Sequence, residues 1–405
     1  MTNQDLLALA DTYGTPFYVF DLDALADRTR RIQTFFSGTA SICYAMKANP
    51  FLVGPLKPQI ERFEVCSQGE FHICERMGIP RKKIVLSGVS KTEEELMEVL
   101  EGGGAGIYTA ESIRHLILLE QCGERKSAVL PVLLRVTSGN QFGMDRETVK
   151  DIVKRRKEYP FLHIIGLQYY SGTQKKKPEK VADEYRNFLR FAGELRDELG
   201  FEAKELEFGP GFPVPYFAGE RWPEEEEWLN ALKAAIEEEP APVKVTLEMG
   251  RFLAAECGTY LTSVADQKRN EGENYLILDG GIHHVNYYGQ MMAMKRPEME
   301  FLPRKEGGSP ETMWNLCGSL CTVSDVLVKE VPLPGPEIGD RIAFRKIGAY
   351  SVTEGIYLFL SRDLPKVLFF SEKEGPVLAR DSLPTNVWNS PNEFNERKDR
   401  KQWKS

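Results

Sequence analysis

Residues Tyr44 to Asn49 (YAMKAN) end an apolar run that begins near Ala40 and is typical of a buried parallel strand. Lys47 lies at the end of this run. An ammonium group withdrawn from water is costly unless it is paired, has a shifted pKa or is used covalently. Two interpretations of Lys47 stay open: it snorkels to solvent at the rim of a barrel, or it forms a Schiff base.

Short β-type runs alternate with helical segments from Ala40 onward, which indicates βα units and a parallel sheet. The predicted strands are 40–48, 62–67, 83–88, 106–110, 129–136, 164–171, 205–212 and 244–251, and the predicted helices lie near 52–60, 69–78, 91–101, 111–121, 145–157, 178–199 and 224–238. Eight such strands predict an α/β fold, the (β/α)8 TIM barrel. An open doubly wound sheet would need a glycine-rich loop after its first strand, and residues 47–49 are not one.

The alternation of strand-like and helical segments ends after Arg251. Further β runs at 258–266, 274–279, 324–331, 340–348 and 366–370 are joined by turn-rich connectors. They predict a second, C-terminal all-β domain. The β-rich run Thr15 to Asp21 precedes the repeating pattern, and we expect it to pair outside the barrel.

These patterns predict three parts of the chain. Residues 1–24 form an N-terminal segment that joins the β domain, residues 25–255 form the barrel, and residues 256–405 form the C-terminal β domain. Residues 295–311 are charged and rich in Pro and Gly, which predicts a surface excursion. Residues 383–405 are polar, and we expect them to be frayed or to lie along the surface.

Composition and charge exclude several classes of protein. Of 405 residues, 42% are hydrophobic and 28% charged, as in ordinary globular proteins, and a net charge of -8 argues against a nucleic-acid binder. No run reaches the roughly 18 apolar residues of a membrane span, and residues 1–14 resemble an acidic helix rather than a signal peptide. Seven scattered cysteines indicate reduced thiols in a cytoplasmic protein. Cys317 and Cys321 lack a second ligand pair, so we expect no metal.

Chemically distinctive residues cluster where barrel strands end, the face on which TIM barrels carry their chemistry. They include Lys47 after strand one, Arg135 on strand five, residues 169–173 after strand six, residues 209–211 after strand seven and residues 248–251 after strand eight. Glycines after strands seven and eight commonly bind phosphate through backbone N–H groups. Together with the lysine they indicate a phosphorylated aldehyde cofactor.

The chain resembles the fold-type III pyridoxal-phosphate decarboxylases, the family of diaminopimelate and ornithine decarboxylases, which share an alanine racemase-like barrel. The matching motifs are YAMKAN at 44–49, SGTQ at 171–174, LEFGPGFPV at 206–214, EMGR at 248–251, GSLCTVSD at 318–325 and GAY at 348–350. Six motifs in the family's order are far more specific than any single match.

The resemblance implies roles for individual residues. Lys47, Glu248 and Cys321 would be catalytic: Lys47 carries the Schiff base, Glu248 keeps the pyridine nitrogen protonated as an electron sink, and Cys321 returns a proton to Cα. Pyridoxal phosphate would be bound by Lys47, Arg135, Tyr170, Ser171, Gly172, Gly209, Gly211, Glu248, Gly250, Arg251 and Tyr350, and the substrate by Arg251, Thr322 and Tyr350. The family further implies a homodimer in which both subunits complete each active site.

Some positions depart from the diaminopimelate pattern. Thr322 replaces the acidic residue that holds a distal ammonium, and Tyr170 replaces a histidine that stacks on the cofactor. These changes resemble a biosynthetic branch that includes the glutamyl-carrier-protein decarboxylase of the butirosin pathway. Lys175, Lys176 and Lys177 either make the entrance positive for an anionic or carrier-linked substrate or form a solvated loop.

The expected reaction is therefore α-decarboxylation of an amino acid or of a carrier-linked amino acyl group. Three alternatives stay open at this point: diaminopimelate decarboxylation in lysine biosynthesis, an amino-acid racemase, and a non-catalytic protein that binds pyridoxal phosphate. Glu248 argues against a racemase of this fold, which would place an arginine at the pyridine nitrogen. The predicted β domain argues against the non-catalytic class, whose members consist of the barrel alone.

Overall fold

The computed structural model describes residues 1–238, 243–305 and 310–391. The chain divides into two compact units. The barrel unit comprises residues 26–215 and 221–254. The β unit comprises residues 1–25 and 216–220 and the described residues from 255 onward.

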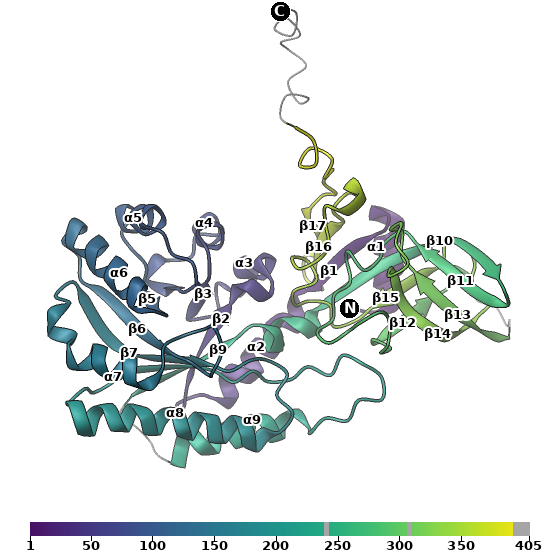
Figure 1. Cartoon of the computed structure of the whole chain (residues 1–405). Helices are drawn as coiled ribbons and strands as arrows, with labels where there is room; N and C mark the ends of the chain where they lie inside the picture. The colour runs from purple at the N-terminus through teal and green to yellow at the C-terminus, as the bar shows by residue number, and fades with distance from the viewer. Residues whose placement is uncertain (239–242, 306–309, 392–405) are drawn as a thin grey trace, which may run out of the picture. The chain divides into compact units, whose positions relative to one another are not determined.

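Eight parallel strands close the barrel in the order of the sequence, which confirms the predicted TIM barrel. They are β2 (Ser41–Ala45), β3 (Arg62–Val65), β4 (Ile84–Leu86), β5 (Ile107–Ala110), β6 (Leu130–Val136), β7 (Leu162–Tyr170), β8 (Glu205–Gly209) and β9 (Lys244–Met249). The helices that follow or precede them are α2 (Leu22–Phe35), α3 (Val53–Leu56), α4 (Gln68–Arg76), α5 (Glu93–Glu101), α6 (Ile113–Lys126), α7 (Arg146–Lys154), α8 (Pro178–Leu199), α9 (Glu225–Glu238) and α10 (Arg251–Ala254). The longer helices surround the strands on the outside (Figure 1).

Side-chain caps fix where several outer helices begin. Ser67, Thr92, Ser112 and Asp145 each accept a hydrogen bond from a backbone N–H in the first turn of α4, α5, α6 and α7. Such a cap contributes about 1 kcal/mol. Because these helices follow β3, β4, β5 and β6, the caps also fix the loops at the carboxyl ends of those strands.

The barrel interior is polar along β8. Glu205 and Glu207 are two residues apart and therefore share the inward face of the strand. Glu205 lies at the start of the strand, where Arg62 of β3 pairs with both of its carboxylate oxygens and Thr246 of β9 donates a hydrogen bond at 2.9 Å. Glu207 lies one layer nearer to the carboxyl ends of the strands.

A bulge in β7 sets the register of the next layer. Ile164 pairs with Val132 but Gly166 pairs with Leu133, so Ile165 is the extra residue. Beyond the bulge, Gln168 lies between Arg135 of β6 and Glu207 of β8 in the two adjoining ladders. The bulge therefore determines which residue of β7 lies beside Glu207.

The β unit is built on one sheet. Its strand order is β14-β13-β11-β10-β1-β16-β17, and β15 joins β10 to β12. The strands are β1 (Phe17–Asp21), β10 (Gly258–Asn270), β11 (Glu273–Leu278), β12 (Met299–Leu302), β13 (Glu311–Cys317), β14 (Val326–Pro334), β15 (Arg341–Phe344), β16 (Lys366–Ser371) and β17 (Gly375–Arg380). Helix α1 (Asn3–Tyr13) packs Leu6 and Leu9 against Phe17, Leu261 and Leu368. Strand β1 thus pairs with β10 and β16 and lies outside the barrel.

The prediction for residues 295–311 was partly wrong. Met299–Leu302 forms β12, which pairs antiparallel with β15, and β13 begins at Glu311. Residues 306–309 of the same stretch lie outside the described residues. The charged and Pro-rich composition hid a short strand whose pairing partner is more than 30 residues away in the sequence. Strand β17 was also not predicted.

Two other stretches differ from the predicted division. Residues 216–220 were assigned to the barrel, but Phe217 bridges to Pro297 and the Ala218 N–H donates to Arg296 within the β unit. Leu383 pairs with Leu364, while residues 392–405 of the predicted frayed terminus lie outside the described residues. In the part of the chain that the structure describes, no helix combines the length and apolar character needed to cross a membrane.

Candidate active site

Lys47 lies on the tight turn that follows β2. The turn consists of two short 3-10 helices, Met46–Ala48 and Pro50–Leu52, and Asn49 caps the second by accepting a hydrogen bond from the Phe51 N–H at 3.0 Å. The Tyr44 hydroxyl donates to the Asn49 carbonyl oxygen at 3.0 Å. These bonds hold the backbone on both sides of Lys47.

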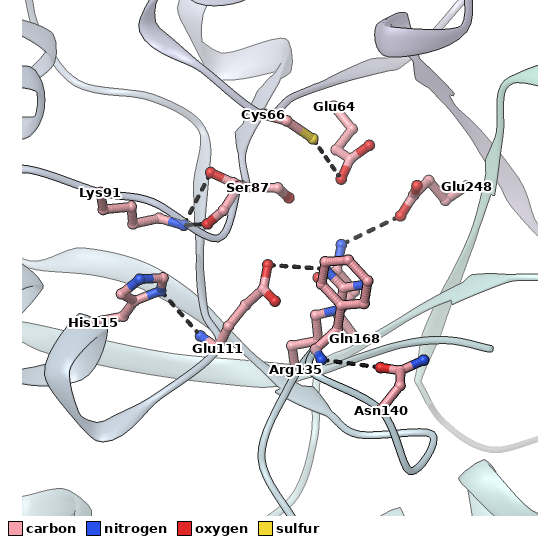
Figure 2. A network of polar contacts seen from close by, with 12 residues as sticks. Glu64, Cys66, Ser87, Lys91, Glu111, His115, Arg135, Asn140, Gln168 and Glu248 are labelled. Atoms are coloured by element: carbon pink, nitrogen blue, oxygen red, sulfur yellow. Dashed lines mark hydrogen bonds and ion pairs between the residues drawn. The ribbon is translucent and has the colours of Figure 1, made fainter. Parts of the chain in front are cut away.

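Two buried carboxylates bind the amine of Lys47. Its Nζ atom pairs with Glu64 at the end of β3 and with Oε1 of Glu248 on β9 at 3.0 Å. The Lys47 side chain is 35% exposed, whereas those of Glu64 and Glu248 are 3% and 7% exposed. The Lys47 side chain therefore extends from the exposed mouth of the barrel to two buried carboxylates. The carboxylates of Glu64 and Glu248 and the thiol of Cys66 are drawn in Figure 2.

The two carboxylates have opposite pKa shifts. Burial opposes ionisation of Glu64, but the Lys47 ammonium holds the pKa of Glu64 below its usual value. Burial and then the Glu64 carboxylate raise the pKa of Glu248 to about 7. One amine thus neutralises Glu64 fully and Glu248 only in part, because two like charges in one buried site cannot both be stabilised equally.

Cys66 adds a thiol to this site. Its Sγ atom lies 4.0 Å from Lys47 Nζ and donates to Glu64 Oε1 at 3.5 Å. Burial and the Glu64 carboxylate raise the pKa of Cys66, so the sulfur carries its proton at neutral pH. Cys66 is therefore a hydrogen-bond donor in this site rather than a nucleophile.

Arg135 of β6 is held by neighbours on both sides. Its Nη1 atom pairs with Glu111 at 2.8 Å, and its guanidinium lies 4.9 Å from the centre of the Phe142 ring (Figure 2). Nearby, Lys91 donates to the carbonyl oxygens of Ser87 and Gly88, and burial lowers the pKa of Lys91 to about 8. Lys91 thus ties down the loop after β4.

Glycines at two strand ends allow close approaches of the backbone. Gly211 after β8 has φ +63°, and a Cβ there would overlap the carbonyl oxygen of Gly172 after β7. A Cβ on Gly250 after β9 would come within 2.9 Å of the Ala48 Cβ, next to Lys47. Gly211 and Gly250 therefore let the loop after β8 approach the loop after β7 and the loop after β9 approach the Lys47 turn, as a backbone phosphate site requires.

Tyr170 is the last residue of β7, and Ser171 follows it. A Cβ on Gly209 would meet the Tyr170 ring, so Gly209 makes room for that ring. The Ser171 hydroxyl donates to Glu184 at 2.6 Å. On the next loop, Arg251 Nε donates to Thr173 Oγ1 at 3.3 Å, which ties the start of α10 to the SGTQ motif.

The three consecutive lysines do not form one positive patch. Lys175 is buried and pairs with Glu184 at 2.9 Å, and Lys176 lies 3.8 Å from the centre of the Trp222 ring. Neither interpretation left open by the sequence, a positive entrance or a solvated loop, fits Lys175. Glu184, in the second turn of α8, was the partner that sequence spacing did not reveal.

Cys321, Thr322 and Tyr350 belong to the β unit. The Cys321 thiol is exposed, on a turn after β13 that Asp325 holds by accepting N–H bonds from Ile282 at 2.8 Å and Leu320 at 2.7 Å. Thr322 Oγ1 lies 3.0 Å from Ser324 Oγ. The structure thus divides the predicted site residues between two units, with Lys47, Glu248, Arg135 and the glycine loops in the barrel.

Several polar residues of the barrel mouth escaped the sequence reasoning. Glu64 was noticed only as part of a strand end, and Gln168, Glu207, Lys91 and Glu111 were not singled out. Glu207 stands inside a predicted strand next to the glycine loop, and a charged residue within a buried strand is the signal that could have found it.

Comparisons with known proteins point to one family. Residues 22–255, more than half of the chain, match the sequence model described as pyridoxal-dependent decarboxylase, pyridoxal binding domain. The chain is 26% identical over 386 residues to L-glutamyl-[BtrI acyl-carrier protein] decarboxylase of Niallia circulans, which covers 89% of this chain and 90% of that relative. It is 27% identical over 389 residues to 2-[(L-alanin-3-ylcarbamoyl)methyl]-2-hydroxybutanedioate decarboxylase of Staphylococcus aureus, covering 90% and 96%.

A solved structure agrees with these matches. Diaminopimelate decarboxylase of Methanocaldococcus jannaschii in complex with L-lysine superimposes with a TM-score of 0.81 at 26% identity, covering 93% of this chain and 92% of that one. The family match spans the barrel with its Lys47 turn, and the structural match extends through the β unit. The chain belongs to the pyridoxal-dependent decarboxylases.

Proposed function

We propose that this protein removes the α-carboxyl group of an amino acid or of a carrier-linked amino acyl group, with pyridoxal phosphate bound covalently to Lys47. The observation that carries this proposal is the contact of Lys47 Nζ with Glu64 and Glu248 at the end of β2. A lysine that only fills a core needs one counter-charge. Lys47 contacts two buried acids, and its side chain is 35% exposed.

The residues of the barrel mouth fit the cofactor. Lys47 supplies the amine for the aldehyde carbon, and the close-packed glycines after β7, β8 and β9 supply backbone for the phosphate. When bound, pyridoxal phosphate supplies an electron sink for the pair that decarboxylation leaves on Cα. Arg251 and Tyr350 complete the proposed set of phosphate and substrate contacts, and Tyr170 would stack on the ring.

Glu248 would keep the pyridine nitrogen protonated. Burial and then the Glu64 carboxylate raise its pKa to about 7 although Lys47 lowers it, so a protonated ring nitrogen beside Glu248 would add a charge that favours its ionised form. Arg135 would bind the cofactor from a fixed position, because its guanidinium pairs with Glu111. In this arrangement Glu64 and Glu248 take different parts: Glu64 holds the amine, and Glu248 is released to the ring nitrogen.

Cys321 would return a proton to Cα from a second subunit. Its exposed turn lies in the β unit beside a cavity of about 260 Å³ that Ser324, Met292 and Ile356 help to line. The same unit exposes large apolar side chains, namely Met291, Met292, Met294, Val323, Ile356, Leu358, Phe359 and Leu360. Such a surface supports a homodimer in which the partner covers it and both subunits complete each site.

A mixing experiment tests this homodimer. Lys47→Ala and Cys321→Ala subunits, each inactive or slow alone, should regain activity when mixed, because one site of each mixed dimer has both groups. Sedimentation as a monomer, with no activity regained on mixing, would rule out shared sites.

The substrate class rests on Thr322. The relatives named above act on a carrier-linked glutamyl group, a hydroxybutanedioate derivative and diaminopimelate. A neutral threonine offers no counter-charge for a distal ammonium, which favours a neutral or anionic tail over diaminopimelate or lysine. Diaminopimelate decarboxylation stays the second candidate because full-length relatives carry it out. Buried thiols at Cys43, Cys74 and Cys122, which form no disulfide, support a reducing compartment such as the cytoplasm.

Release of carbon dioxide tests the function. The purified protein with pyridoxal phosphate is given glutamate, ornithine, lysine and meso-diaminopimelate, each free and, where chemistry allows, as a thioester on a carrier protein. We expect release from an anionic or carrier-linked substrate, and Thr322→Glu should shift preference towards diaminopimelate by about tenfold. Efficient release from diaminopimelate by the wild type would return the assignment to lysine biosynthesis, and no release from any substrate would overturn decarboxylation.

A further inference from the structure

A second row of polar residues lies behind Glu248. Gln168 of β7 and Glu207 of β8 face each other in the ladder, and their exposed fractions are 1% and 0%. The Gln168 Nε2 atom donates to Glu207 Oε1 at 2.7 Å and to Glu248 Oε2 at 3.4 Å. One amide group therefore joins Glu207 to Oε2 of Glu248, while Lys47 Nζ contacts Oε1 at 3.0 Å.

Among the described residues, Glu207 forms no ion pair with a lysine or arginine. Its Oε2 atom has no hydrogen-bond partner among the described residues. The titratable or charged side chains that face it are Glu248 and Lys244 on β9, Glu64 and Arg62 on β3, and Cys43 on β2. Arg62 is already bound by both oxygens of Glu205. Burial, and then the carboxylates of Glu248 and Glu64, raise the pKa of Glu207 to about 8.

The two acids set the direction of the Gln168 amide. Glu207 Oε1 accepts one N–H of the amide, as the carbonyl oxygen of a protonated acid can, which leaves the second N–H for Glu248. Turning the amide over would place its oxygen against Glu248 Oε2, where two acceptors would repel each other. The Gln168 oxygen itself has no partner within the described part of the chain, so the two acids fix the amide.

We propose that Gln168 and Glu207 are positioning residues for Glu248: Gln168 holds one carboxylate oxygen by a donated hydrogen bond, and Glu207, as an uncharged acid, fixes the Gln168 amide. The inference rests on the proposed role of Glu248 at the pyridine nitrogen. Because the second oxygen is held independently of Lys47, Glu248 keeps its place when the amine is used by the cofactor.

The first test replaces Glu207 by glutamine in the full-length protein. Glutamine reproduces an uncharged acid, so kcat at pH 7 should stay within about threefold of wild type. Thermal unfolding without cofactor gives a readout independent of activity. The wild type binds a proton on folding between the unfolded pKa near 4.5 and the folded pKa near 8, so its Tm should fall relative to Glu207→Gln as pH rises from 5 to 8. A Tm difference that is constant with pH would show that Glu207 is ionised and would overturn the proposal.

The second test removes the amide. Gln168→Met keeps the length of the side chain but donates no hydrogen bond, and kcat should fall about tenfold with little change in KM. The lower pKa of the kcat profile should rise, because Glu248 loses a donor that favours its ionised form. The matched control is Gln33→Met, which removes a 2.8 Å amide bond to the Gln59 carbonyl far from the mouth and should leave the profile unchanged.

The outcomes separate this inference from the proposed function. If Gln168→Met leaves both kcat and its pH profile as in the control, the positioning role is wrong although decarboxylation stands. If neither wild type nor control releases carbon dioxide, the proposed function fails, and the Tm comparison for Glu207 still decides whether that acid is uncharged.

Discussion

The two ends of the barrel interior differ in how their buried charges are balanced. At the amino-terminal ends of the strands, Arg62 meets Glu205 with two parallel hydrogen bonds, and Thr246 supplies a third. At the carboxyl ends, a single amine, Lys47, faces Glu64 and Glu248, with Glu207 one layer below. Both ends lie within one barrel and share the same strands.

We interpret the difference as one between a structural cluster and the proposed functional one. Matched charges with all hydrogen bonds made stabilise one arrangement. Burial and then the neighbouring acids raise the pKa values of Glu248 and Glu207 to about 7 and about 8, so protons can move near neutral pH. Such perturbed groups in a barrel mouth are typical of active sites.

The largest expected effect is the loss of the Glu248 charge. Glu248→Gln should lower kcat by about 10²- to 10³-fold, the usual cost of removing one preorganised electrostatic contact from a transition state. Cofactor affinity should change much less, since the lysine and the glycine loops stay intact. Steady-state kinetics together with cofactor titration measure both quantities. An unchanged kcat would mean that the charge of Glu248 does not contribute to catalysis.

The matched cluster should respond in stability instead. Arg62→Met leaves Glu205 buried without its partner and should lower the free energy of unfolding by about 3 kcal/mol. The double variant Arg62→Met, Glu205→Gln removes the unpaired charge and should recover part of that loss. Urea denaturation with intact cofactor binding as a folding control checks this. A double variant as unstable as the single one would contradict the description of this cluster as a balanced ion pair.

Because buried acids outnumber their cationic partner at the carboxyl ends of the strands, the free energy of unfolding should depend on pH. Glu248 holds a proton in the folded state up to about pH 7 and the unfolded chain releases it near pH 4.5, so this group makes stability fall as pH rises through that window, by about 3 kcal/mol. Glu64, whose pKa is lowered, acts in the opposite sense and contributes stability that is lost as pH falls below about 4.5. Glu248→Gln, denatured without cofactor from about pH 3 to about pH 8, should lose the first dependence and keep the second. Identical curves for variant and wild type would contradict these assignments.

The smallest expected effect concerns Cys66. Since its thiol only donates a hydrogen bond to Glu64, Cys66→Ser should change kcat less than about threefold, because a hydroxyl donates equally well. Cys66→Ala serves as the comparison that removes the donor. A loss of activity in the serine variant comparable to that of Glu248→Gln would reveal a chemical role for the sulfur.

Much of the fold and part of the site could be predicted from sequence because they rest on local patterns. Lys47, Glu248 and the glycine loops stand at strand ends, where the βα repeat places them by counting. Gln168 and Glu207 could not be found in this way, since a bulge at Ile165 decides which residue of β7 lies beside Glu207. The Lys175–Glu184 pair and the short strand β12 likewise depend on partners that spacing does not specify.

The comparisons also decide between the functions that the sequence left open. The matched family and the relatives named above are decarboxylases, which argues against an amino-acid racemase and against a non-catalytic protein that consists of the barrel alone. The relatives differ in what they act on, so the choice of substrate stays part of the proposal that rests on Thr322.

Borohydride reduction followed by peptide mass spectrometry tests the central claim most directly. The purified protein is incubated with pyridoxal phosphate, reduced, digested and compared with Lys47→Ala and with Lys91→Ala, which removes an amine whose pKa burial lowers to about 8. The account predicts the reduced cofactor on the peptide that contains Lys47 in the wild type and in Lys91→Ala, and on no peptide in Lys47→Ala. Cofactor trapped on Lys91, or on no lysine of the wild type, would contradict it.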